Sequence, residues 1–278
     1  MVSKKILLIV VGLLFMGLAT PVYALNYALS FDGIDDYIKI SDSNSLDLSM
    51  GMTIEAWIRS NSNEGARAIV SKWNDFTIQR SYILKDHNDS DKLLVDLLSA
   101  GSLQGSTSIA LNTWVYVAAT YDSNYIKLYY NGIEDNVCFS PWTIDHSTAD
   151  LLIGAVYTPT VEDFSGIIDE VRIWDYARTP QQLQDGMNYS LTGNESGLVG
   201  YWNFDEGNGQ VVHDLTIYAN HGQLGSTTGT DGNDPAWVLS DGQYGQSRDV
   251  VPEPASVSLL GLGALGLLFK GKNRLIKG

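Results

Sequence analysis

The chain has 278 residues and is acidic, with 32 aspartates and glutamates against 17 lysines and arginines and a formal net charge of −15. An acidic surface repels phosphate groups, so nucleic acid and anionic lipid are poor partners and divalent cations are favoured. The single cysteine, Cys138, allows no intramolecular disulfide, and its apolar neighbours favour a buried, inert thiol.

The chain begins with the three parts of a secretory signal peptide. Lys4 and Lys5 form a charged region and residues 6–18 an apolar one. Residues 22–24 (Val-Tyr-Ala) supply small residues at the first and third positions of a cleavage site. We therefore predict a signal peptide over residues 1–24, with an uncleaved N-terminal anchor as the alternative. Without the two apolar ends, 11 basic and 31 acidic residues remain, so the mature region carries about −20.

Short segments of alternating apolar and polar residues follow, separated by turn residues about every ten positions. The clearest of these segments are residues 37–40, 53–59, 126–130, 151–154 and 167–174. Asn131 and Gly132 form a strong hairpin signal, because both tolerate a positive φ. Only residues 179–187 look helical, with Thr179 as the N-cap. Many short strands with frequent turns are typical of a β-sandwich.

Four segments carry motifs in a recognisable order. They are ALSFDGIDDYI at 28–38, TIEAWI at 53–58, WVYVAATYD with LYYNG within 114–132, and GIIDEVRIW at 166–174. This order resembles the laminin-G-like, concanavalin A-like jelly-roll domains over residues 26–188. The resemblance implies an all-β fold, a jelly-roll sandwich of two antiparallel sheets, which we expect to occupy residues 25–225.

A second block, from residue 200 to 224, departs from the family pattern. In many relatives a segment of this kind precedes the opening strand, whereas here it follows the helix. Either residues 200–225 fold back as an added edge strand of the same sandwich, or they are the partly ordered remnant of a neighbouring repeat. The predicted domain boundary at residue 225 assumes that the block is an added edge strand. Residues 226–250 are rich in Gly, Asp, Thr and Ser, which predicts a flexible linker.

The carboxylates do not form a recognisable catalytic pattern. Glycoside hydrolases hold two carboxylates about 5–9.5 Å apart. Hydrolases of this fold commonly carry them on one strand as Glu-x-Asp-x-x-Glu, which this chain lacks. Asp169 and Glu170 are neighbours in one strand, so we expect them on opposite faces. We therefore expect no catalysis, with an unrecognised polysaccharide hydrolase or lyase as a rival.

Carboxylates are concentrated at the first predicted turn, which contains Asp32, Gly33, Asp35 and Asp36. Ca²⁺ takes six to eight oxygen ligands from such groups. The resemblance implies a structural calcium that joins this turn to the late strand. Its ligands would be Asp32, the Gly33 carbonyl and Asp169, with Asp36 as a further one. The alternative is a solvated acidic turn whose aspartates accept hydrogen bonds from nearby backbone.

Glycan binding would need aromatic platforms and planar polar side chains on an exposed face or loop. Trp73 and Trp142 lie in loop-like sequence and are the candidate platforms. Arg80, Tyr82 and Tyr157 are candidates for the rim of the same site. For both tryptophans, the alternative is an anchor that fixes its own loop.

The chain closes with three ordered parts. Val251-Pro252-Glu253-Pro254 is followed by an apolar run, residues 255–269, and then by four basic residues. At about 1.5 Å per residue, the run is short for a ~30 Å hydrocarbon core. The order resembles the PEP-CTERM sorting signal, here 251–278. That resemblance implies cleavage by an exosortase after transient inner-membrane anchoring through a transmembrane helix at 255–269. The alternatives are a plain tail anchor and a buried core helix.

Together these observations predict an exported module at the cell surface or in the extracellular matrix of a Gram-negative-type bacterium. We expect it to bind carbohydrate, namely a polysaccharide or matrix glycan, and to be stabilised by Ca²⁺. The main rival is a structural or adhesive surface protein that binds other proteins.

Overall fold

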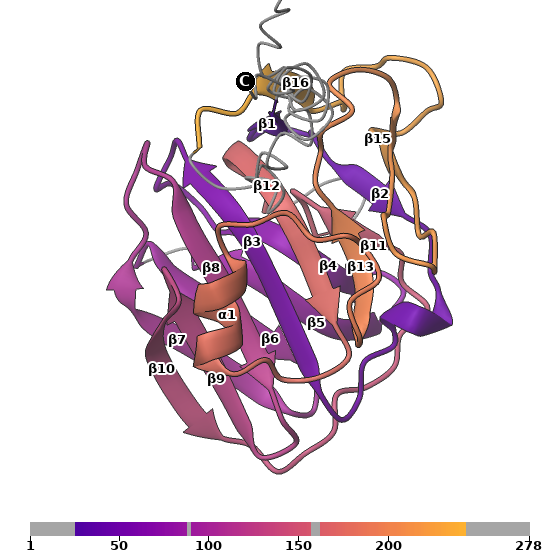
Figure 1. Ribbon diagram of the computed structural model, residues 1–278. Coiled ribbons are helices and arrows are strands. Elements are labelled where there is room, and N and C mark those ends of the chain that lie inside the picture. Colours follow the sequence, from indigo (N-terminus) through magenta and orange to yellow (C-terminus); the bar gives the residue numbers. More distant parts are fainter. Residues whose placement is uncertain (1–25, 88–89, 157–161, 243–278) are drawn as a thin grey trace, which may run out of the picture.

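The computed structural model of the protein describes residues 26–87, 90–156 and 162–242. Within them, two antiparallel sheets pack face to face, and one short helix lies on the outside (Figure 1). The predicted signal peptide, sorting signal and transmembrane helix lie outside the described residues. In the described part, no helix is long and apolar enough to cross a membrane.

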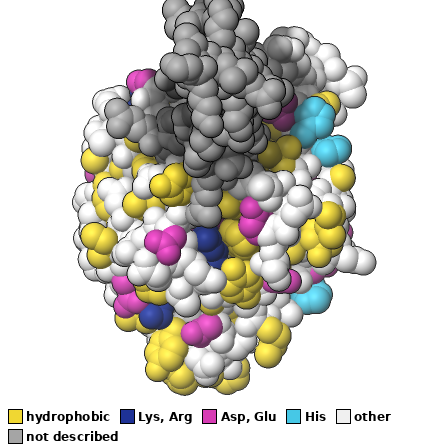
Figure 2. Space-filling view, viewed as in Figure 1, with side chains coloured by type: hydrophobic (Ala, Val, Ile, Leu, Met, Phe, Trp, Pro, Cys, Tyr) yellow, Lys and Arg dark blue, Asp and Glu magenta, His cyan; other side chains and the backbone are white. Residues whose placement is uncertain are grey.

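Sheet A contains β1 (Tyr27–Asp32), β3 (Met52–Ser60), β8 (Val115–Tyr121), β9 (Tyr125–Tyr130), β10 (Ile133–Phe139), β12 (Ser165–Trp174), β13 (Leu198–Trp202) and β16 (Ala236–Leu239). The order is β10-β9-β8-β3-β12-β1-β16, and β13 pairs with the end of β12. Few basic side chains appear on the outer face of this sheet (Figure 2).

Sheet B contains β2 (Ile38–Ile40), β4 (Arg67–Asn74), β5 (Gln79–Asp86), β6 (Lys92–Leu97), β7 (Gly101–Ser108), β11 (Leu151–Ile153), β14 (Val211–Val212) and β15 (Gly222–Leu224). Its order is β14-β15-β2-β11-β4-β5-β6-β7. A single-turn 3-10 helix, Asn44–Leu46, follows β2.

The core lies between the two sheets and follows from the alternation seen in the sequence. Ile54, Ala56 and Ile58 of β3 point into it from sheet A, and Tyr82 and Leu84 of β5 point into it from sheet B. Because successive residues of a strand face opposite sides, each strand gives one face to the core and one to the outside. The predicted all-β jelly-roll sandwich of two antiparallel sheets is confirmed.

The helix α1 (Pro180–Gly186) lies on the outer face of sheet A (Figure 1). The Thr179 hydroxyl accepts a hydrogen bond from the Gln182 backbone N–H at 3.2 Å, and the Gln182 side chain accepts one from Thr179 N–H at 2.8 Å. This reciprocal pair is a capping box. Leu183 then packs against Tyr116 of β8. The predicted short helix is confirmed.

Charged side chains are buried between α1 and sheet A. Glu55 accepts hydrogen bonds from Arg178 at 2.7 and 2.9 Å and from Trp174 Nε1 at 3.1 Å. Arg172 lies 3.5 Å from Glu55 and 2.5 Å from Glu170. The four charged side chains are at most 7% exposed. Since a buried charge is tolerated only when it is paired, this cluster fixes the helix to the sheet.

Asp169 and Glu170 do not point to opposite faces, as the strand alternation predicted. Ile168 and Val171 both face the core, and the pairing of β12 with β3 shifts register between Asp169 and Arg172. Glu170 has a φ of 53°. A β-bulge therefore inserts an extra residue and leaves both carboxylates on the outer face, so the alternation argument was wrong here.

The chain after the helix folds back onto both sheets. β13 pairs with β12 in sheet A, and β15 pairs with β2 in sheet B. The second block of the sequence thus folds back onto the same sandwich, as the first alternative expected, with β14 at the edge of sheet B and β13 added to sheet A.

The segment from residue 226 to 242, expected to be part of a flexible linker, belongs to the sandwich. β16 pairs with β1, and Asp241 accepts hydrogen bonds from Arg59 at 2.7 and 2.8 Å and from Trp114 Nε1 at 2.8 Å. The prediction was wrong because a four-residue strand inside a polar, glycine-rich stretch gives almost no periodic signal. Residues 243–250 lie outside the described part.

Candidate glycan-binding groove and acidic turn

The outer face of sheet B carries an open cavity of about 260 Å³ over β4, β5 and β6. Because Tyr82 and Leu84 face the core, Ile83 and Lys85 of the same strand face outward. The cavity is lined by Trp73, Asp75, Arg80, Ile83, Lys85, Asp96, Val156 and Glu162. Five of these eight residues are charged, and Trp73, Ile83 and Val156 supply the apolar part of the lining.

Trp73 is held in this cavity by polar and apolar contacts. Its Nε1 donates a hydrogen bond to Asp75 at 3.1 Å, and Arg80 pairs with Asp75 at 2.5 Å. The Arg80 guanidinium lies 5.6 Å from the centre of the Trp73 ring. The ring also packs against Ile83 and Val156. An indole fixed in this way loses little conformational entropy when it contacts a ligand.

The hairpin between β4 and β5 carries two more apolar side chains next to Trp73 in the sequence. Phe76 is 69% exposed and Ile78 is 75% exposed. Ile78 has a φ of 57°, which is an outlier for a β-branched residue. Strained backbone of this kind gathers at binding sites. The sequence analysis missed this hairpin tip, although the run Asn-Asp-Phe-Thr offered a turn signal.

Two further cavities continue the first one across sheet B. One of about 50 Å³ shares Trp73 and Val156 with it and adds Lys39 and Asp150. The next, of about 340 Å³, shares Lys39 and is lined by Ser41, Val211, His221, Gly222, Gln223, Gly225 and Ser226. Because neighbouring cavities share lining residues, the three lie in one row over the outer face of the sheet, from β15 to β6. We call this row of cavities the sheet B groove.

The candidate glycan-binding residues are only partly brought together. Trp73 and Arg80 are in contact in the groove. Tyr82 is fully buried in the core, where its hydroxyl donates to the Leu46 carbonyl at 3.1 Å, so it does not reach the groove. Trp142 is 66% exposed but does not line the groove. Tyr157 lies outside the described residues.

Asp32, Asp35 and Asp36 meet at the turn between β1 and β2. One carboxylate oxygen from each lies within 4.8 Å of the others. Asp36 is only 5% exposed and accepts a hydrogen bond from the Asp32 backbone N–H at 2.7 Å. Gly33 has a φ of 80°, and a Cβ there would lie 2.7 Å from Ser165 Cβ, so this turn requires glycine.

The carboxyl groups of this turn are crowded and partly buried. Burial, together with the charges of Asp32, Asp35 and Asp234, raises the pKa of Asp36 to about 7, against the effect of the hydrogen bond from Asp32. Asp234 Oδ1 is buried without a hydrogen-bond partner in the described structure. Crowded, partly buried carboxylate oxygens suit Ca²⁺, so the residues present fit such an ion.

Asp169, the fourth candidate ligand, lies away from the turn. Asp32 is paired with Ser165 and Leu29 with Ile168, so Asp169 lies four residues along β12 from the partner of Asp32. At ~3.3 Å per residue this is ~13 Å. The Asp169 side chain is fully buried, and its Oδ2 has no hydrogen-bond partner in the described structure. The structure therefore does not join it to Asp32, Gly33 and Asp36.

The turn instead contacts the loop before β16, which the sequence analysis had assigned to the linker. Asn233 Nδ2 donates to the Asp35 carbonyl at 3.2 Å, and the Asn233 carbonyl accepts from Tyr37 N–H at 3.2 Å. The acidic run Asp-Gly-Asn-Asp at 231–234 was the available signal, but nothing local indicates that it packs against residue 35.

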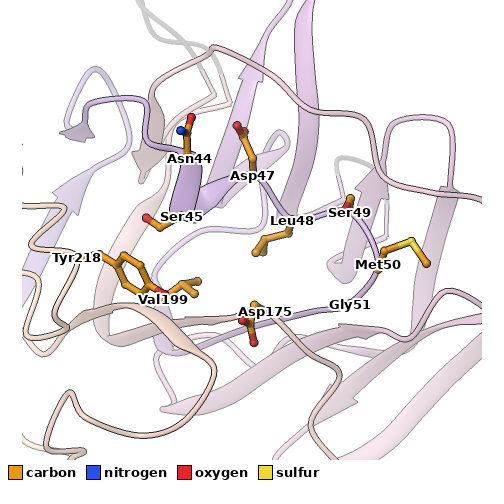
Figure 3. Close-up of a pocket in the computed structure, with 10 residues that line it drawn as sticks. All are labelled: Asn44, Ser45, Asp47, Leu48, Ser49, Met50, Gly51, Asp175, Val199 and Tyr218. Atoms are coloured by element: carbon orange, nitrogen blue, oxygen red, sulfur yellow. The ribbon is translucent and has the colours of Figure 1, made fainter.

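A separate pocket of about 320 Å³ lies at one end of the sandwich, lined by Asn44, Ser45, Asp47, Leu48, Ser49, Met50, Gly51, Asp175, Val199 and Tyr218 (Figure 3). The side chains of Asp47 and Asp175 point away from each other in this pocket (Figure 3). They do not form the pair that faces a scissile bond in glycoside hydrolases.

Comparison with known protein families assigns the chain to one of them. Residues 32–184 match the model of the concanavalin A-like lectin/glucanases superfamily, so the chain belongs to that superfamily. Residues 250–274 match the PEP-CTERM protein-sorting motif. Both resemblances seen in the sequence are confirmed. The motif indicates export and processing by an exosortase.

Individual relatives are distant. Human Pappalysin-1 is 22% identical over 189 residues, and the mouse protein is 24% identical over 182 residues. Each match covers 58% of this chain and 11% of the relative, so the chain spans about a tenth of the length of the curated relatives it matches.

Two solved structures share the fold. One is a candidate carbohydrate-binding protein from Bacteroides ovatus, with a TM-score of 0.62 and 22% identity, covering 79% of this chain and 61% of that one. The other is a heptameric SAP-like pentraxin from Limulus polyphemus, with a TM-score of 0.50 and 16% identity, covering 80% of this chain and 94% of that one. At these identities the likeness concerns the fold alone.

Proposed function

We propose that the protein is a non-catalytic surface or matrix module that binds polysaccharide in the sheet B groove. The contact of Trp73 with Arg80 and Asp75 carries this proposal, because it fixes an aromatic ring beside planar hydrogen-bonding groups in an open groove. Sugars offer apolar C–H faces and many hydroxyls, which such groups contact together. The carbohydrate-binding description of the Bacteroides ovatus relative supports the same reading.

We expect Trp73→Ala to weaken polysaccharide binding at least about tenfold, because truncating a central aromatic anchor commonly costs 2 kcal/mol or more. Affinity electrophoresis in gels that contain matrix polysaccharides measures the effect. Trp142→Ala is the matched control, since Trp142 is 66% exposed and does not line the groove. Trp73→Phe should retain part of the affinity.

Equal losses in the two alanine variants would contradict the groove as the binding site. Absence of binding to every polysaccharide would favour the structural or adhesive protein that binds other proteins. New reducing ends or unsaturated products in the same incubations would favour the hydrolase or lyase.

The proposal includes a structural calcium at the acidic turn, held by Asp32, Asp35 and Asp36 and supported by Asp234 nearby. A divalent cation would neutralise carboxylates that otherwise repel one another. The turn joins β1 of sheet A to β2 of sheet B, so an ion there would strengthen the connection between the layers.

A further inference from the structure

The charge of the sheet B groove bears on which polysaccharides it can accept. Besides His221, its lining includes three lysine and arginine side chains in the described structure, and each of these three is paired with a carboxylate. Arg80 pairs with Asp75 at 2.5 Å, Lys85 with Glu162 at 2.7 Å, and Lys39 with Asp150 at 3.2 Å. The charge of each of these cations is therefore already balanced by a carboxylate, and the groove offers an incoming anion no unbalanced lysine or arginine.

Asp96 gives the groove one more carboxylate than it has cations. The molecule around it is strongly acidic, with a formal net charge of −15. Both the local excess and the overall field repel polyanions. Carboxylates are acceptors with about four lone-pair positions, so a carboxylate engaged by one cation can still accept hydrogen bonds from hydroxyl groups. An uncharged chain brings such donors without the repulsion.

The shape of the groove indicates a chain that is longer than one sugar. It crosses β15, β2, β11, β4, β5 and β6, which are neighbours in sheet B. With strands ~4.8 Å apart, six strands give a length of about 24 Å. Trp73 and Val156, shared by two of the cavities, lie toward the middle of this path.

We propose that the sheet B groove selects uncharged polysaccharide chains over polyanionic ones and binds them across the strands from β15 to β6. This inference rests on the proposed polysaccharide-binding function and adds the ligand class and the direction of binding.

The test is calorimetric titration of the full-length protein at 150 mM NaCl. The probes are hexasaccharides of uncharged glucan, xylan, mannan and galactan, and hexamers of galacturonate and mannuronate. At least one uncharged hexasaccharide should bind at least tenfold more tightly than either uronate, and at least tenfold more tightly than its own disaccharide.

Asp96→Lys should raise the affinity for the uronates, and Asp96→Asn should raise it less. Glu64→Lys is the matched control, because it makes the same charge change at an exposed residue outside the groove lining. Uronates that bind as tightly as the uncharged chains would overturn the charge selection but keep polysaccharide binding. A disaccharide as tight as its hexasaccharide would overturn the extended mode. Binding of none of the probes would overturn both this inference and the proposed function.

Discussion

Asp36 combines burial with three neighbouring acidic groups, so its protonation affects stability. Burial raises its pKa from 3.8 to about 7. Between those values the folded chain holds a proton that the unfolded chain has released. The free energy of unfolding therefore falls as pH rises from about 4 to about 7, and it stays low above that range. Calcium would replace the proton, so it should stabilise the protein more at pH 8 than at pH 5.

We expect Asp36→Asn in chelator to unfold at a higher temperature than the unmodified protein at pH 8, and to show little difference at pH 4. The neutral amide can still accept the hydrogen bond from Asp32 N–H but carries no buried charge. The variant should also lose much of the calcium response. Thermal unfolding followed by circular dichroism at both pH values, with calcium or chelator, measures each effect. A melting temperature unaffected by calcium in the unmodified protein would exclude the proposed ion.

For individual residues, the sequence predicted the acidic turn but not the residues that contact it, such as Asn233. The motif at residues 32–36 identified the clustered carboxylates, and the structure places them together. Asp169 was assigned to them by family resemblance, and only the register of β1 on β12 reveals the separation. The prediction that Tyr82 lines the glycan-binding site was wrong for a related reason. Tyr82 lies in β5, at a position whose side chain points into the core, and the sequence around it does not show which face of the strand it takes.

The helix α1 lies over a buried cluster of charged side chains. Glu55 is fully buried and is the shared acceptor for Arg178, Trp174 and Arg172. Glu55→Gln would leave the buried arginines with too little negative charge, which should cost about 3–5 kcal/mol. Glu134→Gln is the control, because Glu134 is a surface partner of Lys127 and such pairs contribute about 0.2–1 kcal/mol.

Chemical denaturation with urea compares the two variants, and a similar small loss in both would contradict the anchoring role of the cluster.

The helix could be predicted from the sequence because the residues that cap it, Thr179 and Gln182, are close together in the chain. The charged cluster beneath the helix could not be predicted in this way, because its members come from β3, β12 and the turn before α1, which are far apart in the sequence. Sequence patterns identify such elements but do not indicate which buried charges meet between them.

For the whole molecule, the excess of acidic residues should make stability depend on salt. Like charges repel across the compact state, and raising NaCl from 10 to 150 mM shortens the Debye length from ~30 to ~8 Å. In chelator at pH 8 we expect the melting temperature to rise by roughly 2–4 °C, equivalent to about 1 kcal/mol for a domain of this size. At pH 4 many carboxylates are protonated, so the rise should shrink. Differential scanning calorimetry at both pH values measures it, and an equal rise at both would contradict the charge explanation.

The pairing of β16 with β1 also sets when the molecule can finish folding. Tyr27 lies opposite Leu239, so one edge of β1 stays unpaired until β16, the last described strand, is in place, while β12 pairs with the other edge. Contacts between residues so far apart in the chain form slowly, because a long loop must close before they are made. A chain that is still emerging from a translocation channel lacks its closing strand and stays incomplete. A strand of four residues would then set the point at which the sandwich closes.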